Sequence, residues 1–215
     1  MAAYGRPTLR DIFDEAPTPH IAHPPRTHHR DFYVATDGSY RGAGDGTETG
    51  PDGGLGVVIE TRDGERVARL SVTNRAPNNN VAEYRALHLG LDVLAARSPG
   101  GANVGVLVDH DDLAANLNAA VLNARDPTFD AHDVSVPGAV SLHWRGVRTR
   151  LRDFDEVRAA RLHSNTNPAH PLANDPDAYA HVNAEPDRCL LPEAPLAGVD
   201  EGHPPPSRAD RGASD

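Results

Sequence analysis

The 215-residue sequence contains no lysine, and all 21 of its basic residues are arginine. Its single cysteine, Cys189, excludes an internal disulfide and a cysteine cluster for metal, which fits a reducing compartment. No apolar run approaches the ~20 residues that a membrane-spanning helix needs, and no basic-then-apolar signal sequence opens the chain. Aromatic residues make up only 5% of it. We expect a soluble, cytoplasmic protein without a membrane partner, with part of its chain in loops or tails.

The charge balance limits the partners of the chain. Its acidic residues outnumber the basic ones 31 to 21, which gives a formal net charge of -10. This argues against nucleic-acid binding through bulk attraction, so any such contact must be local. An acid excess without lysine is typical of a high-salt cytoplasm combined with a GC-rich genome, and GC bias alone is the alternative. In ~1 M salt, charges interact only over ~3 Å, so an acidic surface would repel phosphate less.

The chain length and composition predict one domain between two extensions. Residues 1–29 are interpreted as an N-terminal extension, residues 30–175 as the domain, and residues 176–215, which are polar and rich in proline, as a disordered tail. Within the first extension, Thr8 is predicted to cap a short helix over residues 9–15.

The apolar pattern within the domain predicts a mixed sheet of the α/β class. Strands are expected at 31–36, 54–60, 66–73 and 103–108, a helix at 81–96 and a shorter helix near 112–123. Residues 141–151 and 156–163 are interpreted as two strands, or as a strand and a helix. The first three strands follow one another through hairpins and are therefore antiparallel, whereas the strand after the helical crossover lies parallel to one of them.

Three carboxylates stand at related places in this pattern. Asp37 is expected just past the first strand, Asp109 just past the fourth, and Glu83 in the first turn of the helix between them. Taken singly, they are typical of a turn, a helix cap and a residue favoured by the helix dipole. If the two strands are neighbours and parallel, all three carboxylates meet and would repel one another unless cations were bound. Hard divalent cations prefer such oxygen ligands, and two of them can promote phosphodiester cleavage.

Four segments of the sequence resemble type 1 ribonuclease H, in particular its archaeal and reverse-transcriptase-like branch. They are YVATDGS (33–39), GGLGVVIE (53–60), NNNVAEYRALHLGLDVL (78–94) and VGVLVDHDDL (104–113). The resemblance covers about residues 31–118, with a weaker match near 156–174, and the composition makes a haloarchaeal source our expectation. It implies a ribonuclease H-like fold: a five-stranded mixed sheet flanked by helices. It also implies an enzyme that cuts the RNA strand of an RNA–DNA hybrid with two Mg²⁺ ions, or Mn²⁺ in their place.

The resemblance assigns roles to individual residues. Asp37, Glu83 and Asp109 match the three catalytic carboxylates that bind metal in the family. Gly38 and Ser39 match a backbone turn that touches substrate. The run Asn78, Asn79 and Asn80 resembles the asparagine-rich helix entry that meets the nucleic acid.

The fourth family ligand is the point of departure. The family pattern Asn-x-x-Ala-Asp is represented by residues 167–173, Asn-Pro-Ala-His-Pro-Leu-Ala, so that His170 stands where an aspartate is expected. We interpret His170 as a catalytic residue and metal ligand, because imidazole binds divalent metal and favours Mn²⁺ over Mg²⁺ relative to a carboxylate. The alternative is a surface histidine in a site that has lost activity.

A basic run follows Trp144. If residues 141–151 form a strand, Arg148 and Arg150 share one of its faces with Arg152 and are predicted to bind the phosphates of the substrate. The alternative is a solvated face that pairs with Asp153, Asp155 and Glu156.

The functional hypothesis is a metal-dependent endonuclease for the RNA strand of RNA–DNA hybrids, acting as a monomer, with any protein partner unknown. Two alternatives stay open. One is a non-catalytic nucleic-acid-binding protein on the same scaffold, which the proline after His170 favours. The other is a nuclease of this fold with a different substrate.

Overall fold

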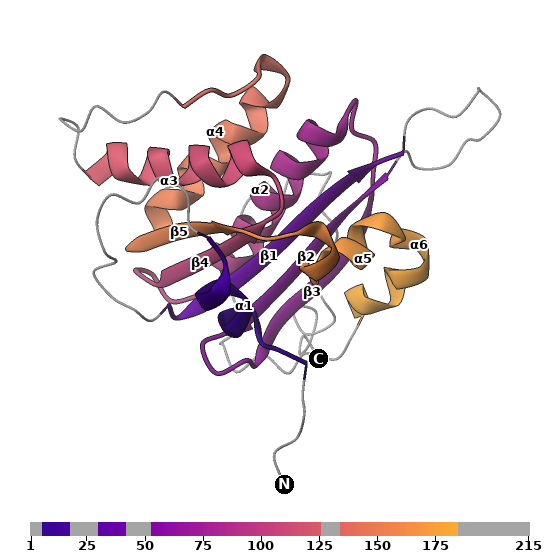
Figure 1. Ribbon diagram of the computed structural model, residues 1–215, viewed down its shortest axis with the longest axis horizontal. Helices are drawn as coiled ribbons and strands as arrows, with labels where there is room; N and C mark the ends of the chain where they lie inside the picture. The colour runs from indigo at the N-terminus through magenta and orange to yellow at the C-terminus, as the bar shows by residue number, and fades with distance from the viewer. Residues whose placement is uncertain (1–5, 18–29, 42–52, 126–133, 185–215) are drawn as a thin grey trace, which may run out of the picture.

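The computed structural model describes residues 6–17, 30–41, 53–125 and 134–184, and a single five-stranded sheet runs through them (Figure 1). The strands are β1 (Phe32–Tyr40), β2 (Gly53–Thr61), β3 (Arg66–Asn74), β4 (Asn103–Val108) and β5 (Glu156–Arg161). Their spatial order is β3-β2-β1-β4-β5. The pairs β1·β2 and β2·β3 are antiparallel, whereas β1·β4 and β4·β5 are parallel. The predicted mixed sheet is confirmed, and the strand after the helical crossover, β4, lies parallel to β1.

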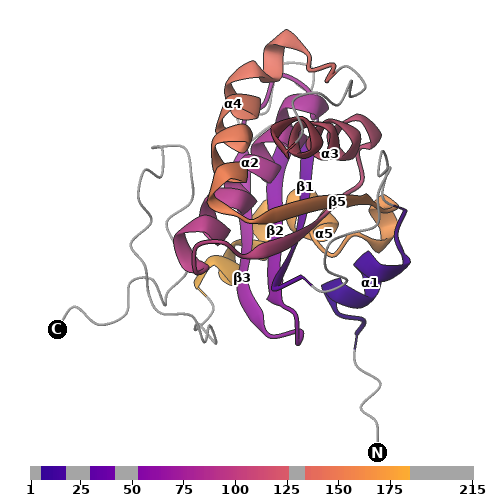
Figure 2. The same ribbon diagram turned by 90° about the vertical axis from the view of Figure 1, so that its left-hand side faces the viewer.

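Helices cover both faces of this sheet. They are α1 (Leu9–Glu15), α2 (Asn79–Arg97), α3 (Asp111–Arg125), α4 (Ser141–Arg150), α5 (His170–Asn174) and α6 (Pro176–Tyr179), with four 3-10 helices, η1 (Gly138–Val140), η2 (Leu151–Asp153), η3 (Ser164–Thr166) and η4 (Ala180–Ala184). One core lies between the sheet and α2, α3 and α4, and a second between the sheet and α1 and α5. Figures 1 and 2 show α2 and α4 on one side of the sheet and α1 on the other. No helix among the described residues is long and apolar enough to cross a membrane.

On each edge strand of the sheet, an asparagine side chain hydrogen-bonds the backbone N–H and C=O of one residue. The Asn118 amide on α3 donates to the Ala159 carbonyl at 2.9 Å and accepts from the Ala159 N–H at 2.8 Å on β5. Asn183 in η4 makes the same pair of bonds to Ser71 on β3, at 2.7 and 2.9 Å. A carboxamide reproduces the donor and acceptor of a peptide group, so each asparagine replaces one residue of a missing neighbouring strand.

Replacing Asn118 by leucine is expected to lower the free energy of unfolding by roughly 2–4 kcal/mol. The change conserves side-chain size but leaves the buried N–H and C=O of Ala159 without partners. Urea unfolding would measure it, with Asn165→Leu, an exposed position, as the matched control. Equal urea midpoints for the unaltered chain and Asn118→Leu would contradict this account of the edge.

Helices on both sides of the predicted domain, at residues 9–15 and 176–184, pack against the sheet. The predicted helix over residues 9–15 is confirmed, with Thr8 as its cap, and its Leu9 and Phe13 are buried against the sheet. The prediction that the disordered tail begins at residue 176 is wrong for residues 176–184, because Val182 is buried and Asn183 binds β3. The remaining parts of both predicted extensions, 1–5, 18–29 and 185–215, lie outside the described residues.

Of the two alternatives for residues 141–151 and 156–163, the one with two strands is wrong, because residues 141–151 form α4 and the start of η2. The apolar residues Val140, Trp144, Val147 and Leu151 recur at intervals of three and four and pack in the core shared with α2. The arginines at alternating positions between these apolar residues suggested a strand face, although the apolar residues themselves follow a helical period. The strand at residues 156–161 is present, so the segment is a helix followed by a strand.

Candidate active site

Two parallel strands bring Asp37 and Asp109 to one place. In the register of β1 and β4, Ala35 pairs with Leu107, and two further residues along each strand lead to Asp37 and Asp109. The prediction that Asp37 lies just past the first strand is wrong. Asp37 lies within β1, where it pairs with Gly56 of β2. Asp109 directly follows β4, as predicted. The parallel pairing explains why residues 72 positions apart share a site.

Gly38 lets the helix α2 approach the strand that carries Asp37. A Cβ atom at Gly38 would lie 2.2 Å from the backbone carbon of Ala82, so no larger residue fits beneath the first turn of α2. The Gly38 N–H donates to the Glu83 carboxylate at 3.2 Å. The interpretation of Gly38 and Ser39 as a turn is therefore wrong, because both are strand residues, and Gly38 positions Glu83 beside Asp37.

The carboxylates occupy an environment that disfavours charge. Asp37 and Glu83 are each only 3% exposed. Burial, reinforced by the neighbouring charge of Asp109, raises the pKa of Asp37 to about 8. Burial, reinforced by Asp37 and Asp109, raises the pKa of Glu83 to about 10. A bound cation would remove this penalty, because it favours the ionised form of each group.

His170 joins this cluster from the first residue of α5. Its Nδ1 lies 3.2 Å from Oδ2 of Asp37, and Asn174 one turn later places its amide nitrogen 2.8 Å from Nε2. Asp37, Asp109 and His170 each offer a ligand atom within 4.8 Å of the others. Glu83 lies outside this closest trio. Two carboxylates and an imidazole suit a divalent metal, and the imidazole favours Mn²⁺ over Mg²⁺.

Hydrogen bonds that the sequence did not reveal fix α5 to the sheet. The buried Asn167 donates to the Thr36 carbonyl at 2.9 Å and accepts from the Ala169 N–H at 3.0 Å. At the other end of α5, Ser39 and Ser71 donate to the carbonyls of Ala173 and Leu172, both at 2.6 Å. Ser39 was predicted to touch substrate through its backbone, and its hydroxyl instead binds α5.

A sequence signal for this close packing exists in β2. Gly54 and Gly56 alternate along the strand, so both leave the same face of the sheet bare. A Cβ atom at Gly56 would lie 2.2 Å from the Ala169 carbonyl oxygen, and one at Gly54 would lie 2.4 Å from that of Ala173. The alternation therefore marks where a backbone, rather than side chains, covers the sheet.

The predicted asparagine run lies at the start of α2. Asn78 is the helix cap, and its side chain accepts from the Val81 N–H at 3.0 Å. Asn79 hydrogen-bonds the Glu83 carboxylate, which partly offsets the rise in its pKa. Asn80 lies 3.1 Å from Nε2 of His110, the residue after Asp109. All three asparagines are exposed at the rim of the carboxylate cluster, and His110 is a rim residue that sequence reasoning missed.

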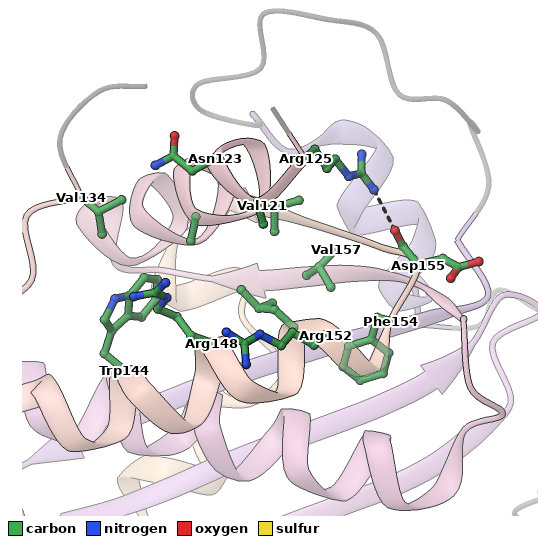
Figure 3. Close-up of a pocket in the computed structure, with 13 residues that line it drawn as sticks. Val121, Asn123, Arg125, Val134, Trp144, Arg148, Arg152, Phe154, Asp155 and Val157 are labelled. Carbon is green, nitrogen blue, oxygen red and sulfur yellow. Dashed lines mark hydrogen bonds between the residues drawn. The ribbon is translucent and has the colours of Figure 1, made fainter. Parts of the chain in front are cut away.

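The structure does not bring Arg148 and Arg150 to the carboxylates. Arg150 forms an ion pair with Asp92, which follows Glu83 by nine residues, or about 13 Å along α2. Arg148 lines a groove between α3 and α4 instead (Figure 3). Their predicted shared strand face is absent because α4 is a helix.

This architecture is similar to that of several solved structures. The N-terminal RNase H domain of rv2228c from Mycobacterium tuberculosis, solved as a fusion with maltose binding protein, is 25% identical. The match has a TM-score of 0.50 and covers 67% of this chain and 96% of that one. The fold is ribonuclease H-like.

Two further solved structures share this ribonuclease H-like fold. LC11-RNase H1, isolated from compost by a metagenomic approach, is 21% identical with a TM-score of 0.51, over 70% of this chain and 98% of that one. The foamy viral protease-reverse transcriptase in complex with RNA/DNA hybrid is 17% identical with a TM-score of 0.51, over 74% of this chain and 22% of that one. No protein-family model and no curated protein matches the sequence.

Proposed function

We propose that this chain is a metal-dependent endonuclease that cleaves the RNA strand of RNA–DNA hybrids. The observation that carries the proposal is the convergence of Asp37, Glu83 and Asp109 on the ribonuclease H-like sheet, with the His170 imidazole 3.2 Å from Asp37. The name of the mycobacterial domain and the hybrid in the foamy viral complex support the same reaction and substrate.

Asp37, Glu83, Asp109 and His170 would hold two Mg²⁺ or Mn²⁺ ions. The donor chemistry fits, because buried carboxylates with raised pKa values gain most from a bound cation. Such ions supply an activated water and stabilise the leaving oxygen. The chain itself keeps its ligands at fixed positions: Gly38 orients Glu83, and Asn167 ties the loop before His170 to β1.

Substrate recognition is assigned to the exposed rim of the cluster. Asn79, whose side chain hydrogen-bonds Glu83, and Asn80, which contacts His110, are both exposed there. Recognition of A-form shape and 2′-hydroxyl groups predicts little sequence preference. Because the net charge is -10, binding depends on these local contacts rather than on a basic surface.

One observation favours a second candidate, a non-catalytic protein that binds nucleic acid. His170 replaces the expected fourth carboxylate and is followed by Pro171. A site that no longer cuts would tolerate this change. The raised pKa values of Asp37 and Glu83 favour catalysis, because an idle cluster of buried acids destabilises the fold at neutral pH.

Cleavage of a strand-labelled RNA–DNA hybrid in high KCl, with Mg²⁺ or Mn²⁺, tests the proposal. We expect cuts in the RNA strand alone, and their loss in Asp37→Asn. Asp63→Asn, in the exposed β2–β3 turn, is the matched control and should cut normally. A chain that binds the hybrid without cutting it in either metal is the second candidate.

A further inference from the structure

A groove unrelated to the carboxylate cluster lies between α3 and α4, with the start of β5 as its floor (Figure 3). Its volume is about 450 Å³. Apolar side chains from all three elements line it, including Val121, Trp144, Phe154 and Val157. Its lining comes from the last turns of α3, from α4 and η2 and from the start of β5, and it includes none of Asp37, Glu83, Asp109 and His170.

Guanidinium groups stand along this apolar groove. Arg125, Arg148 and Arg152 line it, against a single carboxylate, that of Asp155. Arg125 donates to the Asp155 carbonyl at 2.9 Å (Figure 3). Within the described part of the chain, Arg148 and Arg152 are exposed, and their guanidinium groups have neither a hydrogen bond nor an ion pair. Arg150 on the same helix differs, because Asp92 and Asp153 neutralise it.

The unpaired charges form a stripe on α4 and η2. Arg145, Arg148 and Arg152 follow one another at intervals of three and four residues, so they project from one side of the helix. A second hollow of about 390 Å³ lies along this stripe and shares Trp144, Arg148 and Arg152 with the groove. The stripe therefore concentrates positive charge beside apolar side chains, although the chain as a whole has a net charge of -10.

We propose that the groove between α3 and α4 binds an acidic peptide segment of a partner protein that carries a bulky apolar side chain. The apolar side chain would occupy the space over Val121 and Val157, and carboxylates on either side of it would pair with Arg148 and Arg152. Arginine suits this role because its guanidinium group binds carboxylates through two parallel hydrogen bonds.

The groove chemistry favours a peptide over a nucleic acid. Trp144 and Phe154 are only 8% and 7% exposed, and Trp144 packs edge-on against Tyr84 with ring centroids 5.9 Å apart. Neither ring therefore offers a free face on which a base could stack, as single-stranded nucleic acids require. The concave lining is mainly apolar, which suits an inserted apolar side chain better than a phosphate backbone.

The chain carries its own probe for this site, because Trp144 is its only tryptophan and lines the groove. We would titrate the full chain with a short synthetic peptide that has two phenylalanines among glutamates, at ~0.15 M salt. The emission of Trp144 should change and saturate. Peptides with serine for phenylalanine, or glutamine for glutamate, should bind at least about tenfold more weakly.

The double variant Arg148→Glu/Arg152→Glu should lower peptide affinity at least about tenfold, and Arg148→Gln/Arg152→Gln by less. Arg10→Glu makes the same kind of charge reversal at a single position on α1, across the sheet, and should leave the affinity unchanged. Circular dichroism would confirm that the variants fold.

Two results would overturn the proposal. One is an emission of Trp144 that does not respond to the peptide; if an RNA–DNA hybrid changes the emission instead, the groove is assigned to nucleic acid. The other is equal loss of affinity in Arg10→Glu. None depends on whether the carboxylate cluster cleaves.

Discussion

The Glu83→Gln variant is expected to be more stable than the unaltered chain in EDTA at pH 8, and to lose hybrid cleavage. Glutamine has the shape of a protonated glutamate and can still accept the hydrogen bond from Gly38. At pH 8 the unaltered chain must either take up a proton on Glu83, whose pKa is about 10, or bury the charged carboxylate, and both lower its stability. The glutamine side chain avoids both. We expect a gain of roughly 2–4 kcal/mol in the free energy of unfolding. Cleavage should fall by at least ~100-fold, because changes to residues that only support metal ligands already cost metal sites ~10–100-fold.

The same shifts predict how the metal-free chain responds to pH. The folded pKa values of Asp37 and Glu83, about 8 and about 10, lie above their ordinary values of 3.8 and 4.5. Between these limits the folded chain holds protons that the unfolded chain has released. Its stability is therefore greatest below about pH 4 with respect to these groups, and falls as the pH rises toward 8 and 10. Each group contributes up to ~1.4 kcal/mol per pH unit.

Urea unfolding in EDTA at several pH values would measure both effects. The slope against pH should be smaller in Glu83→Gln, and Glu65→Gln, which changes an exposed glutamate, should behave as the unaltered chain does. Added Mg²⁺ or Mn²⁺ should stabilise the unaltered chain more than the variant, because metal binds the folded, ionised cluster. A Glu83→Gln variant that is less stable at pH 8 would show that the pKa of Glu83 is not raised.

Changes at His170 are expected to alter the metal preference of cleavage. His170→Ala should weaken Mn²⁺-dependent cleavage at least about tenfold, because it removes the imidazole beside Asp37. His170→Asp should raise the ratio of Mg²⁺-dependent to Mn²⁺-dependent rates, because a carboxylate favours the harder ion. Initial rates across a concentration series of each metal would measure both changes.

His163→Ala is the matched control for these variants, because His163 is exposed in the segment between β5 and η3. Its cleavage rates should equal those of the unaltered chain in both metals. If His170→Ala cuts at the unaltered rate in Mn²⁺, the imidazole has no part in the site. If His170→Asp leaves the metal ratio unchanged, the histidine does not set the preference.

The sequence by itself determined the sheet and its acids. Alternating and continuous apolar runs mark strands, and the helical crossover before residues 103–108 forces a parallel strand, so the meeting of Asp37, Glu83 and Asp109 follows from local patterns. The contacts of α5 and η4 were decided by the tertiary structure. Asn167, Asn183, Ser39 and Ser71 act through hydrogen bonds to residues 101–134 positions away, and no local pattern encodes such partners.

The tertiary structure also decided which arginines are free. In the sequence, Arg148 and Arg150 are equivalent members of one basic run, and a strand would place them on the same face. The packing of Trp144 and Val147 in the core shared with α2 makes this segment a helix, which turns Arg150 toward Asp92 and Arg148 toward the groove. Whether an arginine is paired depends on which side chains lie next to it in space, and only the folded chain brings Asp92 next to Arg150.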